Sequence, residues 1–273
     1  MNALFVANKP SGTSSNKFLS QIKRKYGVKS AGYSGTLDPF ASGALIVGIG
    51  SYTRLFRYLE LSPKVYEAVM WLGAISESGD NENISSVSLI SPLNLNQIKA
   101  AASELLGEIE YVPPKYSAKH VNGKRAYELA RSGEEFELAP AKMRVFEFDI
   151  TGYSHPFLSF RASVSEGGYI RSLAQILAKK LDVNATLSAL KRLSEGRFFY
   201  DNEKPLCIPD SLNLAQNEYL GDKSDIMLGK KLACDKFKNT NDGVYLVEFE
   251  EFFSIIEIKN AVVAYRLNKV EKC

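Results

Sequence analysis

Hydrophobic residues gather in short stretches that either alternate with polar residues or run together, with glycine, proline and polar residues between them. Stretches of this length and pattern predict β-strands. Before residue 200 we expect strands at 4–7, 45–49, 65–72, 143–150 and 158–164.

Apolar residues spaced three and four apart predict helices between these strands. The first helix should begin near Ser15. Phe18, Ile22 and Tyr26 then share one of its faces, and lysines occupy the other. Further helices are expected near 53–59, at 98–106 with an end at Gly107, at 126–132, and from 170 to 181.

The order of these elements predicts an α+β fold. Strands do not alternate strictly with helices, which favours a mixed, largely antiparallel sheet flanked by helices over a parallel one. The pattern breaks near 204–210, and a polar stretch at 213–225 follows. Strands are expected again at 244–249, 253–258 and 261–267. We therefore expect two parts, 1–208 and a small, mostly β module at 209–273.

Composition indicates the class of protein and its cellular compartment, but says little about its function. The chain has 273 residues, 45% of them hydrophobic and 24% charged, which is typical of a globular protein. No apolar run approaches the roughly 18–20 residues of a membrane span, and the N-terminus lacks the features of a secretion signal. The three widely spaced cysteines and two histidines indicate neither disulfides nor a metal site. We expect a metal-free protein in a reducing cytosol.

The net charge of +3 is mild, but its distribution is uneven. Basic residues cluster at 17–29, 115–131 and 142–144, whereas acidic residues concentrate at 77–82 and 248–251. Basic surfaces of this kind can hold a phosphate backbone. Solvated helix faces produce the same charge runs, so this pattern alone leaves both interpretations open.

The loop 35–44 is the strongest candidate for chemistry. It places Asp38 between Gly35 and Gly43, and Pro39 disfavours helical backbone at the aspartate. A carboxylate fixed in such a loop is a candidate nucleophile or general base. Asp-Pro and Ser-Gly are also ordinary turn signals, so a turn aspartate is the competing interpretation.

Several motifs occur in a fixed order over residues 3–200. They are Lys9-Pro10-Ser11-Gly12-Thr13-Ser14-Ser15, Gly32-Tyr33-Ser34-Gly35-Thr36-Leu37-Asp38-Pro39, Gly50-Ser51-Tyr52-Thr53-Arg54, Tyr66 before Leu72-Gly73, Pro113-Pro114-Lys115-Tyr116-Ser117-Ala118, Gly168-Tyr169-Ile170-Arg171-Ser172 and Lys191-Arg192-Leu193. In this order they resemble the bacterial TruB-type tRNA pseudouridine synthases. The resemblance implies the pseudouridine-synthase fold over 1–208 and conversion of uridine 55, in the T loop of tRNA, to pseudouridine.

An isomerisation needs no redox or energy cofactor, and the chain has no dinucleotide or phosphate-loop fingerprint. The resemblance accordingly implies no cofactor and no metal. It also implies the T arm of tRNA as partner, a monomer that requires no protein partner or membrane, and a cytoplasmic location.

The resemblance assigns catalytic roles to three residues. Asp38 is the catalytic carboxylate, and its attack on the base or on the sugar carbon is left open. Arg171 keeps that carboxylate ionised, since a desolvated carboxylate without a nearby cation tends to take up a proton. Tyr169 is the active-site tyrosine, proposed to help move the proton from carbon 5 of the base.

Other residues are assigned to substrate binding. Tyr66 would stack on the flipped uracil. The segment 116–140 resembles the family's RNA-gripping insertion, which would contact phosphates. Within the insertion the assigned residues are Lys119, Lys124, Arg125 and Arg131. Lys9, together with Pro10, would shape the pocket wall. Asp80, in an acidic loop, and Lys191 are also assigned to substrate binding.

The chain departs from the family pattern in places. Tyr33 stands where the family usually has histidine, and it would stack or hydrogen-bond in the space that flipped nucleotides vacate. The module 209–273 lies where many relatives carry a PUA domain, so we expect a short PUA-like module. The alternative to an enzyme is a non-catalytic RNA-binding or tRNA-folding protein on the same scaffold. A guide-RNA-dependent relative is a weaker third interpretation, because the chain has the bacterial insertion and lacks long basic tails.

Overall fold

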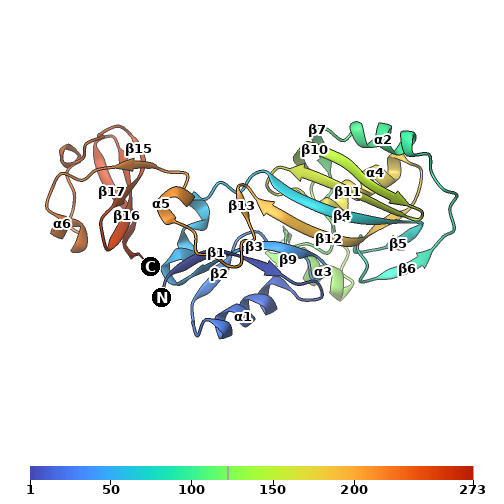
Figure 1. The fold of residues 1–273 in the computed structure, drawn as a ribbon, viewed down its shortest axis with the longest axis horizontal. Coiled ribbons are helices and arrows are strands. Elements are labelled where there is room, and N and C mark those ends of the chain that lie inside the picture. The colour runs from blue at the N-terminus through green and yellow to red at the C-terminus, as the bar shows by residue number, and fades with distance from the viewer. Residues whose placement is uncertain (122, 273) are drawn as a thin grey trace.

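The computed structural model describes residues 1–121 and 123–272. Its largest feature is a mixed sheet that runs through the body of the molecule (Figure 1). Neighbouring strands pair antiparallel except β3 and β12, which are parallel. In order across the sheet the strands are β1 (Ala3–Lys9), β3 (Ser42–Ile49), β12 (Ala185–Glu195), β4 (Lys64–Leu72), β11 (Phe157–Val164), β10 (Ala141–Ser154) and β7 (Gly107–Tyr111). The short strands β2 (Ala31–Tyr33) and β13 (Phe198–Phe199) pair with β3 and β12.

The expected α+β fold with a largely antiparallel sheet is thus confirmed, and the strands expected before residue 200 are all present. The prediction omitted β12, which joins the two halves of the sheet between β3 and β4. It also omitted β7 and placed the end of the preceding helix too late. That helix, α2 (Leu95–Ser103), ends before Gly107, where β7 begins.

Helices cover the sheet on different sides. One face of β4, carrying Tyr66, Ala68 and Met70, packs against α2 and α4 (Ile170–Lys180). The first helix, α1 (Ser15–Lys25), buries Phe18 and Ile22 against β1 and β3. Two 3-10 helices, η1 (Gly50–Arg54) and η2 (Phe56–Tyr58), occupy the stretch where one short helix was expected.

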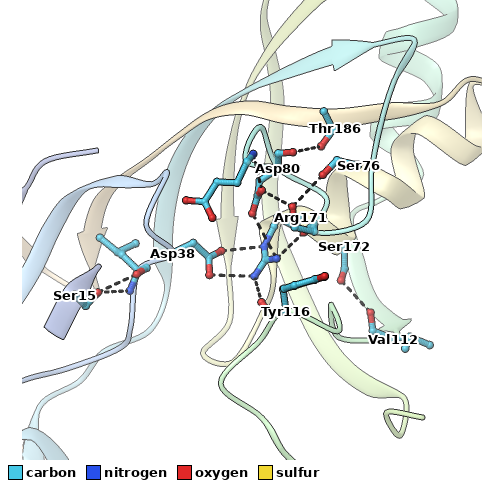
Figure 2. A network of polar contacts seen from close by, with 12 residues as sticks. Ser15, Asp38, Ser76, Asp80, Val112, Tyr116, Arg171, Ser172 and Thr186 are labelled. Atoms are coloured by element: carbon cyan, nitrogen blue, oxygen red, sulfur yellow. Dashed lines mark hydrogen bonds and ion pairs between the residues drawn. The ribbon is translucent and has the colours of Figure 1, made fainter. Parts of the chain in front are cut away.

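The insertion carries little regular structure. It contains the hairpin β8 (His120–Val121) and β9 (Lys124–Arg125), followed by α3 (Ala126–Ser132). A second hairpin, β5 (Ala74–Ser76) and β6 (Ile84–Val87), follows β4. The loop that connects β5 and β6 carries Asp80 to the N-terminal end of α4, where the site lies (Figure 2).

The C-terminal residues form a separate four-stranded sheet at the other end of the molecule (Figure 1). Its strands are β14 (Ala215–Asn217), β15 (Gly243–Glu248), β16 (Phe252–Lys259) and β17 (Val262–Glu271). Short helices α5 (Ile208–Ser211), α6 (Lys223–Met227) and η3 (Cys234–Lys236) accompany them. Among the described residues, no helix is both long and apolar enough to cross a membrane.

Candidate active site

A cavity of about 280 Å³ opens where the 35–44 loop faces the beginnings of β4 and α4. Residues from five separate parts of the chain line it. The lining includes Asp38, Lys64, Tyr66, Lys119, Tyr169, Arg171, Leu190 and Arg192. Uracil is small enough for a cavity of this size, and the cavity is open to solvent on one side.

The loop that carries Asp38 is fixed to α1 and β1 by buried hydrogen bonds. The Ser15 hydroxyl donates to the Leu37 carbonyl at 2.9 Å and accepts from the Leu37 N–H at 3.0 Å. The amine of Lys9, which is fully buried, donates to the carbonyls of Thr13 at 2.5 Å, Pro10 at 3.0 Å and, within the loop, Pro39 at 3.4 Å. Burial lowers the pKa of Lys9 to about 8, although the charge of Asp38 opposes the change. Lys9 therefore supports the loop from behind and does not line the cavity.

Arg171 lies in the first turn of α4 and is only 2% exposed. Its Nε forms an ion pair with Oδ2 of Asp38 at 2.9 Å, and its Nη2 donates to Oδ1 at 3.0 Å (Figure 2). The same guanidinium donates to the carbonyls of Ser78 at 2.6 Å and Tyr116 at 2.8 Å. A planar fork held in this way fixes the direction of the Asp38 carboxylate.

Asp80 is a second carboxylate beside the same guanidinium. Its Oδ2 lies 3.7 Å from Nη1 of Arg171, and the Ser78 hydroxyl donates to its Oδ1 at 2.5 Å. Its backbone carbonyl accepts from the Thr186 hydroxyl of β12 at 3.1 Å (Figure 2). Asp80 thus helps to orient Arg171 from the side opposite Asp38.

The environment of Asp38 acts on its charge in two directions. Burial raises the pKa of the carboxyl above its usual range, and the negative charge of Asp80 adds to this. The positive charge of Arg171 lowers it, without cancelling the effect of burial. The side chain keeps 29% of its surface exposed toward the cavity, so the carboxylate is available to a substrate.

Tyr66 and Tyr169 face the cavity from β4 and from the start of α4. Tyr66 is 6% exposed, so most of its ring packs in the core and one part borders the open space. Burial raises the pKa of Tyr169, the Ser117 hydroxyl lowers it, and the charge of Asp38 raises it further, with a net rise. At neutral pH Tyr169 is therefore a neutral phenol, which can donate a hydrogen bond but is a weak base.

A second hollow, of about 360 Å³, adjoins the first and shares Asp38, Tyr169 and Arg171 with it. Tyr33, Asp80 and Arg131 line this second hollow. The Tyr33 hydroxyl donates to Oδ1 of Asn16 in α1 at 3.0 Å. Tyr33 thus forms part of the wall beside the loop of Asp38.

The other basic residues lie farther out. Lys119 borders the first cavity, whereas Lys124 and Arg125 lie exposed on the β8–β9 hairpin and line neither hollow. Arg125 donates to the Ala118 carbonyl at 2.6 Å, so it also supports the insertion's own backbone. Lys191 is exposed and lines neither hollow, but its neighbour Arg192 points inward and does.

Sequence reasoning missed Lys64, Arg192 and Glu195, which meet beneath the cavity. Lys64 precedes Tyr66 by two residues in one strand, so both side chains face the same side of the sheet, and this was the available signal. Arg192 and Glu195 belong to the strand that was not predicted. In the described part of the chain, no group of three or more His, Cys, Asp and Glu residues could hold a metal ion.

Comparison with known proteins agrees with this geometry. A family model described as TruB family pseudouridylate synthase (N terminal domain) matches residues 23–170. The chain is 59% identical over 273 residues to "tRNA pseudouridine synthase B" of Campylobacter concisus (strain 13826), covering all of both chains. The chain belongs to the TruB family. A relative of the same printed name in Sulfurimonas denitrificans is 52% identical over 272 residues, covering 99% of this chain and 100% of that one.

Solved structures show the same fold at greater distance. A chain from the "Crystal Structure of a Cbf5-Nop10-Gar1 Complex" aligns with a TM-score of 0.69 at 20% identity. The alignment covers 98% of this TruB-family chain and 84% of that one. The pseudouridine-synthase fold is confirmed, and the C-terminal strands belong to the aligned part.

Proposed function

We propose that this TruB-family protein converts uridine 55 in the T loop of tRNA to pseudouridine, with Asp38 as the catalytic carboxylate. Enzymatic conversion of uridine to pseudouridine in tRNA follows from the family and from the full-length relatives named tRNA pseudouridine synthase B. The observation that carries the assignment to Asp38 is its two-point pairing with the buried Arg171 at the wall of a cavity that Tyr66 also lines.

The reaction conserves every atom of the substrate. The C1′–N1 bond breaks and a C1′–C5 bond forms. C5 loses its hydrogen as a proton, and N1 gains a proton. An ionised Asp38 can attack either the sugar carbon or the base, and both routes require the carboxylate that Arg171 orients. Tyr66 would seat the flipped base, and Tyr169 would donate a hydrogen bond while the proton on C5 moves.

RNA binding would rest on the insertion and on the second hollow. Lys119, Lys124, Arg125 and Arg131 would contact phosphates, and Tyr33 would fill space beside the target nucleotide. Lys191 would contact the RNA outside the two hollows. Asp80 would contribute indirectly, by orienting Arg171. We further propose that the protein works in the cytoplasm as a monomer without a protein partner, and that residues 209–273 form a PUA-like module that packs on 1–208.

The test separates chemistry from binding. An unmodified T-arm stem–loop is incubated with the wild type, Asp38→Asn and the exposed control Asp149→Asn, and pseudouridine and RNA affinity are measured separately. We expect Asp38→Asn to form no product while its binding free energy changes by less than about 1 kcal/mol. Product at the normal rate from Asp38→Asn would refute the assignment. A wild type that binds but forms no product would favour the non-catalytic alternative.

A further inference from the structure

A buried network of three charged residues lies under the loop of Asp38. Nζ of Lys64 pairs with Oε2 of Glu195 at 3.0 Å, and Nη2 of Arg192 pairs with Oε1 of the same carboxylate at 2.8 Å. The side chains are 8% exposed for Lys64, 0% for Glu195 and 1% for Arg192. The Ser34 hydroxyl also donates to Oε1 of Glu195, at 3.1 Å.

Arg192 contacts both ends of the catalytic loop. Its Nη2 donates to the Gly35 carbonyl at 2.8 Å, and its Nε donates to the Ala44 carbonyl at 2.8 Å. Asp38 lies between these two points in the sequence. The guanidinium thus spans the two ends of the loop from below.

The loop sits directly on this network. A Cβ added at Gly35 would lie 2.7 Å from Nζ of Lys64 and 2.8 Å from Oε2 of Glu195. A Cβ at Gly43 would lie 2.1 Å from the carbonyl oxygen of Arg192. Both glycines also have positive φ, +46° at Gly35 and +107° at Gly43, so a side chain at either position would be strained, and at Gly43 it would collide with the backbone of β12.

We propose that Arg192, oriented by Glu195, is a positioning residue that holds both ends of the Asp38 loop and so sets the carboxylate against Arg171. This inference rests on the proposed function, because it adds to the machinery of the same reaction. It assigns no contact with the reacting atoms to Arg192.

The energetics support a specific role for the network. Burying two cations and one anion costs free energy that hydrophobic residues of similar volume would avoid. Pairing and hydrogen bonds offset this cost: Glu195 pairs with both cations and accepts from Ser34, and Arg192 also donates to the carbonyls of Gly35 and Ala44. The arrangement also needs arginine, because a lysine has one nitrogen and cannot reach two separated carbonyls and a carboxylate with the same geometry.

A role limited to holding the sheet together explains less. The backbone of β12 already pairs with β3 at Ser42 and Gly43, through the partners Lys191 and Arg192. The guanidinium adds bonds on either side of that pairing, at Gly35 and Ala44. Its contact at Gly35 therefore holds the start of the loop, and its contact at Ala44 holds the start of β3, where the loop ends.

The test compares Arg192→Lys with Arg161→Lys, an exposed arginine on β11 of the same sheet, and with the wild type. Single-turnover pseudouridine formation on the T-arm stem–loop, RNA affinity, and amide hydrogen exchange over 35–44 are measured on each. For Arg192→Lys we expect a rate at least about 30-fold lower, an RNA affinity within threefold, and faster exchange confined to the loop. The acid limb of its rate profile should also move to higher pH, since a displaced Asp38 pairs less well with Arg171. Arg161→Lys should match the wild type throughout.

An unchanged rate and unchanged exchange in Arg192→Lys would overturn the inference, and so would a rate that falls only in proportion to the folded fraction. If Arg192→Lys does not fold, Ser34→Ala removes one bond to Glu195 without leaving a buried charge unpaired. It should lower the rate about three- to tenfold with the same local exchange pattern, and wild-type values would again refute the proposal. A wild type without product would refute the proposed function, while loop-confined exchange would still show that Arg192 positions the loop.

Discussion

Asp38 combines two demands that oppose each other. The proposed reaction needs an ionised carboxylate, yet burial of Asp38 in the cavity wall disfavours that charge. Arg171 opposes the effect of burial by pairing with both oxygens of Asp38. Its own buried charge is balanced by Asp80 and by the carbonyls of Ser78 and Tyr116. Function at this site therefore depends on a group that is more easily ionised in the unfolded chain than in the folded one.

This difference predicts a pH-dependent gain in stability for Asp38→Asn. Because burial raises the pKa of Asp38 in the folded state, ionisation favours the unfolded chain at pH values above that folded pKa. At neutral pH the variant should have a larger free energy of unfolding than the wild type. The gap should narrow as the pH falls below the folded pKa and close only near the ordinary pKa of an aspartate, below which the wild-type carboxyl is neutral in both states. Urea unfolding between pH 4 and 8 measures it, with Asp149→Asn showing no such gain. A less stable Asp38→Asn at pH 7 would show that the attraction of Arg171 outweighs burial.

The proposed role of Tyr66 predicts that its aromatic ring, and not its hydroxyl, carries its contribution to activity. Tyr66→Phe keeps the aromatic face and should retain most of the single-turnover activity. Tyr66→Leu keeps apolar packing in the core but loses a base stack worth about 1–3 kcal/mol, which corresponds to roughly 5- to 150-fold in kcat/KM. Kinetics on the T-arm stem–loop, corrected for the folded fraction of each variant, measure the split. Equal losses in the two variants would assign the role to the hydroxyl instead.

At the scale of elements, the sequence predicted regular pieces well and irregular ones poorly. β4 alternates along its length, β1 and β3 are nearly continuous buried runs, and α3 was predicted with its observed bounds, 126–132. β12 was missed although it is central, because two register shifts, between Leu187 and Ala189 and between Arg192 and Ser194, interrupt its alternation. A bulge of this kind moves successive side chains to the other face, which erases the period of two.

The site shows the same limit. Motif resemblance named Asp38, Tyr66, Tyr169 and Arg171, and the fold brings them to one cavity. The Lys64–Glu195–Arg192 network was not found in this way: the motif Lys191-Arg192-Leu193 contains Arg192 but does not pair it with Lys64 and Glu195, and buried charges are rare. Their partnership is created by the pairing of β4 with β12, which places Lys64 opposite Glu195.

The insertion predicts a salt-dependent contribution to RNA affinity. If Lys119 and Lys124 each neutralise a phosphate, Lys119→Gln and Lys124→Gln should each weaken binding and reduce the slope of log K against log salt by about 0.7–0.9. The exposed Lys179, at the opposite end of α4 from Arg171, provides the control as Lys179→Gln. Binding isotherms at several salt concentrations give the slopes. A slope that stays at the wild-type value in both insertion variants would remove these lysines from the RNA interface.

At the scale of the whole molecule, the C-terminal sheet shares a core with the catalytic sheet. Leu4 and Val6 of β1 and Ile46 of β3 belong to one buried cluster with Phe253 and Ile255 of β16. The other faces of β1 and β3 pack on α1. β3, which leads out of the Asp38 loop, and its neighbour β1 are therefore enclosed between α1 and the C-terminal sheet. The stability of the catalytic part then depends on residues beyond the expected boundary at 208.

This shared core predicts that Phe253→Ala destabilises the entire chain in one transition. Phe253 is 1% exposed, and its ring centroid lies 6.0 Å from that of Tyr52 in η1. Removing a buried aromatic ring costs about 3–5 kcal/mol. If the cluster couples the two sheets, calorimetry should show a single unfolding peak for both proteins, moved to lower temperature in the variant. Phe199→Ala, which removes a phenyl ring that is 64% exposed, should leave the peak in place. The contrary result would be two separate unfolding peaks, of which Phe253→Ala moves only one. The C-terminal sheet would then unfold independently, and the buried cluster between the sheets would contribute little to the stability of the Asp38 loop.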